Sequence, residues 1–262
     1  MLDLTGHTDI PVPEEVLAEL ANACGKSGTE MFVIGAAARD LVIHARKQTL
    51  PVRATHDVDI AVAVRTDAQF QELSQLITRK RSAPHKFKVL GIEVDIIPFG
   101  GNESDRTVRF NDGSRLNVTG IREAHSTSVL VRLPKGTEVH VASPAALTAL
   151  KILAWSERHD DNPKDELDLA VILSSLSESP FDDEVWNDED ALEATDADII
   201  SGASYHYARI AAKPFTPRDG KLVLDIVLDQ AQRSTLIRHM RTPFAEDLLD
   251  AYSRGFAAGL ER

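Results

Sequence analysis

Short apolar runs alternate with amphipathic segments through the first half of the chain. Residues 31–35 form an apolar run that turns at Gly35 into an alanine-rich segment, 36–47, with apolar positions at helical spacing. The next run, 57–64, is apolar on both faces from Ile60 onward, as is typical of a strand covered on both sides. This pattern predicts a strand, a helix and a second strand in that order.

Further segments with the same two kinds of pattern extend this plan. The sequence Asn111-Asp112-Gly113, within the polar region 100–118, predicts the turn of a hairpin. Other helices are expected at 13–24, where Gly25 ends the helix, and at 66–81, and other strands at 86–90, 92–98, 128–133 and 137–142. The fold class expected is therefore α+β, with a mixed β-sheet flanked by helices.

The second half of the chain is helical in pattern. Ser143-Pro144 is an N-cap followed by proline at the first helical position, and it predicts a helix through Arg158. A Ser-rich, acidic stretch at 174–190 is interpreted as a linker, and further helices are expected at 188–212, 219–236 and 243–260. The predicted organisation is thus an α+β domain, 1–178, followed by a helical C-terminal region, 179–262.

Three aspartates interrupt the apolar strands. Asp57 and Asp59 lie two residues apart at the start of one strand and share a face, because side chains alternate along a strand. Asp95 lies between Val94 and Ile96 in another apolar run. Buried carboxylates need partners, and like charges at close range do not all stay ionised without a cation. If the two strands are neighbours, the three carboxylates converge on a site for Mg²⁺, which prefers oxygen ligands together with a substrate's phosphates.

The turn at Gly35 predicts a place for a bound phosphate group. A glycine lets the backbone approach a ligand closely, and the N-terminus of the following helix favours an anion. The expected nucleotide contacts in this segment are Gly35, Ala36 and Arg39. Arg53 and His56, just ahead of the Asp-x-Asp strand, either touch a triphosphate or pair with the nearby carboxylates.

One face of the helix that follows Pro144 carries a second candidate site. Lys151, Trp155 and Arg158 lie at positions i, i+4 and i+7 and therefore share this face. Two cations and an indole in a row suit a phosphate and a stacked base. The alternative for Trp155 is an anchor in the hydrophobic core, and the alternative for Arg158 is an ion pair with an acid.

Asp165 is the candidate acid of the next helix. Asn162 is the expected N-cap and Pro163 the first helical residue, so Asp165 stands where an acid caps a helix reciprocally. Asp168 shares a face with Asp165. Because Asn162 and Pro163 already suit the helix start, we favour an active-site role for Asp165 over a capping role.

Composition and charge narrow the class of protein. The hydrophobic and charged fractions, 43% and 27%, are ordinary for a globular chain, and Cys24 is the only cysteine. No apolar run has the length of a membrane span and the N-terminus does not resemble a signal peptide, so a cytoplasmic protein is expected. The net charge of −12 argues against nucleic-acid binding over the whole surface. Basic residues nevertheless gather in the first half, at 79–81 and at Lys86, Lys88, Arg106, Arg109, Arg115, Arg122 and Arg132.

The order of these motifs resembles a known group of enzymes. A strand, a Gly turn, a helix, Asp-x-Asp on the next strand and a third Asp resemble the nucleotidyltransferase superfamily related to DNA polymerase β. The later motifs, Lys151-x-x-Ala154-x-x-x-Arg158 and Lys164-Asp165-x-x-Asp168-Leu169, make the chain similar to the AbiEii/AbiGii nucleotidyltransferase-toxin group and its bacterial relatives. The resemblance covers about residues 30–175.

This resemblance implies an activity and roles for particular residues. It implies Mg²⁺-dependent transfer of a nucleoside monophosphate from an NTP to an acceptor hydroxyl, with a tRNA 3′ end as a candidate acceptor and a cognate antitoxin as a candidate partner. Asp57 and Asp59 would hold the metal and the triphosphate, and Asp95 would complete the metal site and position the incoming hydroxyl. Lys151 would contact the phosphates, and Asp165 would be the acid of the last motif.

The chain departs from the superfamily at one position, and other readings stay open. Gly35 is followed by Ala36, where relatives carry Gly or Ser, so no hydroxyl is available there for phosphate. One alternative function is a nucleotidyltransferase that modifies a small molecule, as antibiotic-modifying enzymes do. Another is a protein that binds a nucleotide or a partner protein without turnover.

Overall fold

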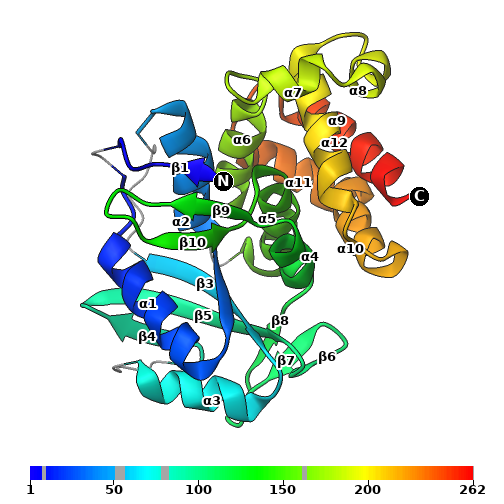
Figure 1. The fold of residues 1–262 in the computed structure, drawn as a ribbon. Coiled ribbons are helices and arrows are strands. Elements are labelled where there is room, and N and C mark those ends of the chain that lie inside the picture. Colours follow the sequence, from blue (N-terminus) through cyan, green and yellow to red (C-terminus); the bar gives the residue numbers. More distant parts are fainter. Residues whose placement is uncertain (8–9, 51–56, 78–82, 161–163, 262) are drawn as a thin grey trace. The chain divides into compact units, whose positions relative to one another are not determined.

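The computed structural model describes residues 1–7, 10–50, 57–77, 83–160 and 164–261. The chain divides into two compact units, Met1–Ser143 and Pro144–Arg262 (Figure 1). The division falls just ahead of the helix that begins at Pro144, whereas the change in composition suggested a boundary after residue 178. The two helices that carry the later motifs therefore belong to the helical unit.

The first unit is built on a seven-stranded mixed sheet in the order β1-β9-β10-β2-β3-β5-β4. The pairs β3/β5, β10/β2 and β1/β9 are parallel, and β2/β3, β4/β5 and β9/β10 are antiparallel. Its strands are β1 (Leu2–Asp3), β2 (Glu30–Ile34), β3 (Asp57–Val64), β4 (Lys86–Val89), β5 (Ile92–Gly100), β9 (Val129–Arg132) and β10 (Glu138–Val141). The expected mixed sheet flanked by helices is confirmed.

Among the described residues, a small second sheet and five short or medium helical segments complete this unit. The small sheet is the antiparallel set β6 (Glu103–Ser104), β7 (Thr107–Arg109) and β8 (Arg115–Asn117). The helical segments are α1 (Glu14–Ser27), α2 (Gly35–Arg39), the π-helix η1 (Asp40–Ala45), α3 (Asp67–Leu76) and α4 (Ile121–Ser126). The helix expected at 36–47 is thus an α-helical turn that continues with π-helical hydrogen bonding.

The two faces of the main sheet are covered differently. On one face α3 packs through Phe70, whose ring lies edge-on to that of Phe87 on β4, with centroids 6.4 Å apart. On the other face His125 of α4 lies against Phe99 of β5 and Phe32 of β2, with ring centroids 5.4 Å and 5.3 Å away. The aspartate side chains near the amino-terminal ends of β3 and β5 point to this second face.

Two helix ends differ from their predicted positions. The prediction that Gly25 ends the first helix is wrong, because α1 continues to Ser27 and Gly28 adopts the left-handed conformation, with φ +62°, at its end. A glycine inside a helix costs only about 1 kcal/mol, so Gly25 is tolerated there. Helix α3 begins as expected after Thr66, whose hydroxyl accepts from the Gln69 N–H, and it ends at Leu76.

The second unit is entirely helical in the part of the chain that the structure describes. Its helices are α5 (Pro144–Arg158), α6 (Asp165–Ser175), α7 (Asp182–Trp186), α8 (Glu189–Ala194), α9 (Ile199–Ala212), α10 (Pro217–Leu228), α11 (Gln230–Met240) and α12 (Ala245–Leu260). The stretch interpreted as a linker contains α7. The helix expected at 188–212 is two helices, because Asp196 and Ala197 adopt positive φ angles between them. None of the described helices combines the length and the apolar character needed to cross a bilayer.

Trp155 lies in the core of the helical unit. Its side chain is fully buried and stacks on His159, with ring centroids 4.5 Å apart. Tyr252 and Phe256 of α12 are fully buried as well, and the Tyr252 hydroxyl lies 3.1 Å from that of Thr148 on α5. Of the two readings of Trp155, the core anchor is therefore the one that the structure supports.

Candidate active site

The register of β3 and β5 brings the strand aspartates together. In this parallel pair Asp59 is the direct partner of Asp95, and Asp57 is the partner of Glu93. Paired positions in a sheet point to the same face, so all four carboxylates share one face of the sheet. Asp59 and Asp95 are half-buried and Asp57 is exposed, whereas Val58 and Ile60 are buried on the opposite face.

The face of the sheet that carries Asp57, Asp59, Glu93 and Asp95 is called the acidic surface below. The turn at Gly35 lies beside it. Ile34 pairs with Asp59 across β2 and β3, so Gly35 follows directly beside the carboxylate. A Cβ atom at Gly35 would collide with Oδ2 of Asp59 and would lie 3.0 Å from its Cβ and Cγ atoms. Gly35 also has φ +67°, a left-handed backbone conformation that residues other than glycine rarely adopt. Glycine is therefore required here both by conformation and by its close approach to Asp59.

Lys86 on the edge strand β4 supplies a cation to the acidic surface. Lys86 pairs with Asp95 in the antiparallel register, and its ammonium donates to both carboxylate oxygens at 3.2 Å and 3.0 Å. Partial burial acts to lower the pKa of Lys86, but the hydrogen bond to Asp95 and the fields of Asp95, Asp59 and Asp57 outweigh it and raise this pKa. The ammonium group of Lys86 is thus stabilised electrostatically by all three strand aspartates.

The aspartates suit a divalent ion in chemistry without forming a finished cage. Among the residues that the structure describes, no three His, Cys, Asp or Glu side chains are grouped as ligands of one metal ion. Mg²⁺ commonly takes one or two carboxylates and completes its shell with water and substrate phosphates. The oxygen donors of Asp59 and Asp95, beside a glycine that leaves space where a Cβ would stand, fit that pattern. The metal site at Asp57, Asp59 and Asp95 stays a prediction.

The other predicted residues of the first unit have varied surroundings. Arg39 is buried and its guanidinium donates to Oδ1 of the fully buried Asp40, at 2.9 Å from Nε and 2.6 Å from a terminal nitrogen. Such a guanidinium is already engaged, so a direct contact between Arg39 and a nucleotide has no support from its surroundings. Gly35 and Ala36 begin α2, and their contact with phosphate stays a prediction. Arg53 and His56 lie outside the described residues, as do the basic residues at 79–81.

The later motifs form a buried ion-pair network between α5 and α6. Lys151 Nζ donates to Oδ1 of Asp165 at 2.8 Å and to Oδ2 of Asp168 at 2.7 Å. Arg158 donates to both oxygens of Asp165, at 2.7 Å and 3.1 Å. The side chains of Lys151, Asp165 and Asp168 are almost fully buried, whereas 52% of the Arg158 side chain is exposed. Arg158 is therefore the accessible cation of this network.

The charges within this network are mutually stabilised. Burial acts to lower the pKa of Lys151, but the adjacent carboxylates of Asp165 and Asp168 outweigh it and raise this pKa. Burial acts to raise the pKa of Asp165, but Lys151 and Arg158 outweigh it and lower this pKa. Asp165 thus points toward Lys151, and its role in the active site stays a prediction. Helix α6 begins at Asp165 after Lys164, so Asp165 is its first residue and not its third, as was predicted. The predicted N-cap Asn162 and first helical residue Pro163 lie outside the described residues.

Two residues of these clusters were not among the predicted site residues. Asp168 was noted only as sharing a face with Asp165, and its spacing of 17 residues from Lys151 gave no sign of a contact. Lys86 was noted only as one of several basic residues. The alternation Lys86-Phe87-Lys88-Val89 does predict that Lys86 faces away from the core, but its contact with Asp95 depends on the pairing of β4 with β5.

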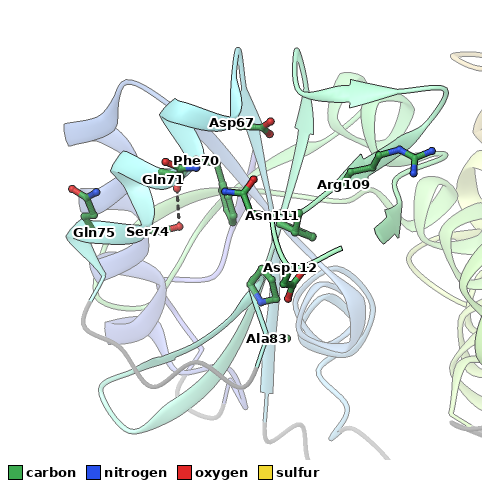
Figure 2. A pocket seen from close by; sticks show the side chains of 11 residues that line it. Asp67, Phe70, Gln71, Ser74, Gln75, Ala83, Arg109, Asn111 and Asp112 are labelled. Carbon is green, nitrogen blue, oxygen red and sulfur yellow. Dashed lines mark hydrogen bonds between the residues drawn. The ribbon is translucent and has the colours of Figure 1, made fainter. Parts of the chain in front are cut away.

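A cavity of about 580 Å³ lies elsewhere in the first unit, alongside α3. Figure 2 shows the side chains that line it, which extend from α3 and from residues 109–112. Phe70, one of these residues, packs against Phe87, on the face of the sheet opposite the aspartates. This cavity is therefore distinct from the acidic surface of Asp59 and Asp95.

Comparison with known proteins identifies the family. A solution structure of the antibiotic-resistance factor ANT(2'')-Ia matches with a TM-score of 0.38 and 12% sequence identity, over 62% of this chain and 83% of that chain. No curated protein matches in sequence. The sequence model of the family described as nucleotidyl transferase AbiEii toxin of a type IV TA system matches residues 41–262, a range that includes the three strand aspartates and the α5–α6 network. The chain belongs to this AbiEii nucleotidyltransferase toxin family.

Proposed function

We propose that this nucleotidyltransferase transfers a nucleoside monophosphate from an NTP, with Mg²⁺, to a hydroxyl group at the 3′ end of a tRNA, and that a cognate antitoxin controls it. The observation that carries the proposal is the pairing of Asp59 with Asp95 on neighbouring parallel strands, beside the backbone of Gly35. Two half-buried carboxylates on adjacent strands favour a cation beside them, and the single charge of Lys86 does not balance the charges on this face.

The proposed roles follow from the exposure and the charge of each side chain. Asp57 and Asp59 would hold the metal ion, which supplies charge stabilisation at the attacking and leaving oxygens of an in-line displacement. Asp95 would complete the metal site and accept the proton of the incoming hydroxyl as the hydroxyl oxygen bonds to the α-phosphorus. The bond between the α-phosphorus and the bridging oxygen then breaks, and pyrophosphate leaves with its electron pair.

The α5–α6 network is proposed to bind phosphate. Arg158 is the exposed member of the network, and Asp165 fixes the orientation of its guanidinium. A guanidinium held in this way suits an anionic oxygen because its orientation entropy is already lost. Lys151 is buried and donates to two carboxylates. It positions Asp165, and its positive charge adds to that of Arg158 without touching the phosphate.

One experiment tests transfer, metal and acceptor together. The purified protein is incubated with each α-³²P-labelled NTP, total RNA and either Mg²⁺ or EDTA, and the RNA is resolved on a gel. Mg²⁺-dependent labelling of bands of tRNA length is expected from one or more nucleotides. Glu93→Gln is the control, because Glu93 lies on the same face as the aspartates and has no proposed role. If RNA stays unlabelled while a small molecule or a protein is labelled, the acceptor is not tRNA.

A further inference from the structure

Lys86 occupies the same oxygen atoms that a metal ion at Asp95 requires. Its ammonium donates to both oxygens of that carboxylate, and the side chains of Lys86 and Asp95 are 47% and 25% exposed. The positive charge of an ammonium at both oxygens of a carboxylate repels a divalent ion at the same group. The ammonium and the metal ion therefore compete for Asp95.

The position of Lys86 makes the ammonium easy to displace. Strand β4 is the edge strand of the sheet and contacts β5 on one side only. Nearly half of the Lys86 side chain is exposed, and partly exposed ion pairs of this kind contribute little to stability. The aliphatic stem can therefore swing to another anion without disturbing the strand, because the backbone hydrogen bonds of β4 do not depend on it.

We propose that Lys86 is a positioning residue that holds Asp95 until the phosphates of an incoming nucleotide draw its ammonium away and leave the carboxylate for the metal ion. This inference rests on the proposed function and adds a coupling between two ligands. Metal alone binds less tightly than it would without Lys86, because it must displace or lie beside the ammonium. Nucleotide and metal together bind well, because the ammonium gains a phosphate partner as the carboxylate gains the metal. The complete metal site thereby forms only when a nucleotide is bound.

The test compares the binding of two simple probes to the wild-type protein and to Lys86→Met. Mn²⁺ alone is titrated and free Mn²⁺ is followed by electron paramagnetic resonance. Lys86→Met should bind Mn²⁺ about tenfold more tightly, since a unit positive charge a few ångströms from a divalent ion in a partly exposed site contributes about one factor of ten. Inorganic triphosphate, titrated calorimetrically without metal, should bind roughly fivefold more weakly to the variant because a charge-assisted contact is lost.

Two further variants separate this role from a structural one. Lys88→Met is the matched control, because Lys88 lies on the same strand and face and pairs with Glu93 in the register instead of Asp95. It should leave both affinities within about twofold of the wild type. Lys86→Arg, which keeps the charge, should retain weak Mn²⁺ binding. A merely structural residue would shift the two affinities in the same direction or shift neither.

The outcomes distinguish this inference from the proposed function. If wild type and Lys86→Met bind Mn²⁺ equally and Asp59→Ala does not, the metal site is real and the role of Lys86 is wrong. If neither wild type nor Lys86→Met binds Mn²⁺, the metal site itself is overturned and both proposals fail. Tighter Mn²⁺ binding together with weaker triphosphate binding in Lys86→Met supports the inference. Thermal melts of each variant show that the proteins compared are folded.

Discussion

At the scale of single residues, the strand aspartates and the α5–α6 network differ in how far their charges are exposed to solvent. Asp59 and Asp95 are half-buried, and nearly half of the Lys86 side chain beside Asp95 is exposed, so the ions around them can exchange with solvent. Asp165 is buried between Lys151 and Arg158, so its partners are fixed by the fold. The first arrangement suits ligands that come and go, and the second suits a permanent support. Substitutions in the two clusters should accordingly have different effects.

Asp59→Ala should abolish nucleotide transfer and leave the protein folded. The substitution removes one of several like charges that share a face, so the melting temperature should stay the same or rise. Transfer activity and thermal melts are measured on Asp59→Ala and on the control Glu93→Gln, which should keep its activity. Gross unfolding of Asp59→Ala would instead show that the carboxylate is structural.

Lys151→Met should destabilise the protein strongly. The substitution leaves Asp165 and Asp168 buried without their shared ammonium partner, and breaking a buried pair in this way costs about 3–5 kcal/mol. The free energy of unfolding is measured by urea denaturation. Arg158→Gln is the comparison, and it should cost less than about 1 kcal/mol because half of that side chain is exposed, while it weakens NTP binding. Equal unfolding free energies for wild type and Lys151→Met would contradict the burial argument.

At the scale of helices and strands, the glycine turn and the strand register decide where the aspartates lie. Gly35 joins β2 to α2 at the point where the backbone passes beside Asp59, and it does so in a left-handed conformation. A side chain at this position therefore meets two separate penalties, one from the backbone conformation and one from the contact. The turn and the acidic surface should respond together to a substitution there.

Gly35→Ala should lower stability by about 1–3 kcal/mol and disturb the acidic surface. The left-handed conformation alone costs about 1–2 kcal/mol, and the added Cβ displaces the carboxylate of Asp59. Gly25→Ala is the matched control, because Gly25 lies within α1 with no atom near its Cβ direction and should gain about 0.5–1 kcal/mol. Both variants are followed by urea denaturation and by Mn²⁺ binding, which should weaken in Gly35→Ala alone.

The ion-pair network between α5 and α6 should make stability depend on pH at the acidic side. The pKa of Asp165 is lowered in the folded protein, mainly because Lys151 and Arg158 outweigh its burial. Its contribution is therefore present above the unfolded pKa of about 3.9 and is lost as the pH falls through the lower folded value. The difference in unfolding free energy between wild type and Asp165→Asn should be largest near pH 7 and shrink below about pH 4. A difference that grows on acidification would contradict this sign.

Local patterns in the sequence predicted much of the fold and part of the site. The alternation around Asp57 and Asp59 and the apolar run around Asp95 fixed which side chains share a face, because a strand has a period of two residues. The contact of Lys86 with Asp95 could not be predicted, because it depends on which strands pair and in which register. The split of 188–212 at Asp196 and Ala197 and the end of α1 at Gly28 depend on left-handed residues that periodicity does not reveal.

At the scale of the whole molecule, family membership extends over both compact units. The family match runs from residue 41 to the end of the chain, so it includes most of the sheet and the entire helical unit. The division of the chain ahead of Pro144 assigns the strand aspartates to one unit and the α5–α6 network to the other. The matched range thus includes residues of both compact units.

The net charge of −12 should make the protein more stable at physiological ionic strength than at very low ionic strength. Repulsion among like surface charges weakens as the Debye length falls from about 30 Å at 0.01 M salt to about 8 Å at 0.15 M. Melting temperatures measured across this range of NaCl should rise by a few degrees, on the order of 1 kcal/mol of stability. A falling melting temperature would mean that attractive surface pairs dominate instead.

The parallel register of β3 and β5 makes the acidic surface sensitive to the parity of insertions and deletions. One extra residue in β5 ahead of Asp95 would turn this side chain toward the apolar face of Val94 and Ile96 and bring an apolar side chain opposite Asp59. Two extra residues would return Asp95 to the acidic face but would move it opposite Ala61, because the register shifts by two. Insertions and deletions in this part of β5 should therefore be tolerated better when they contain an even number of residues.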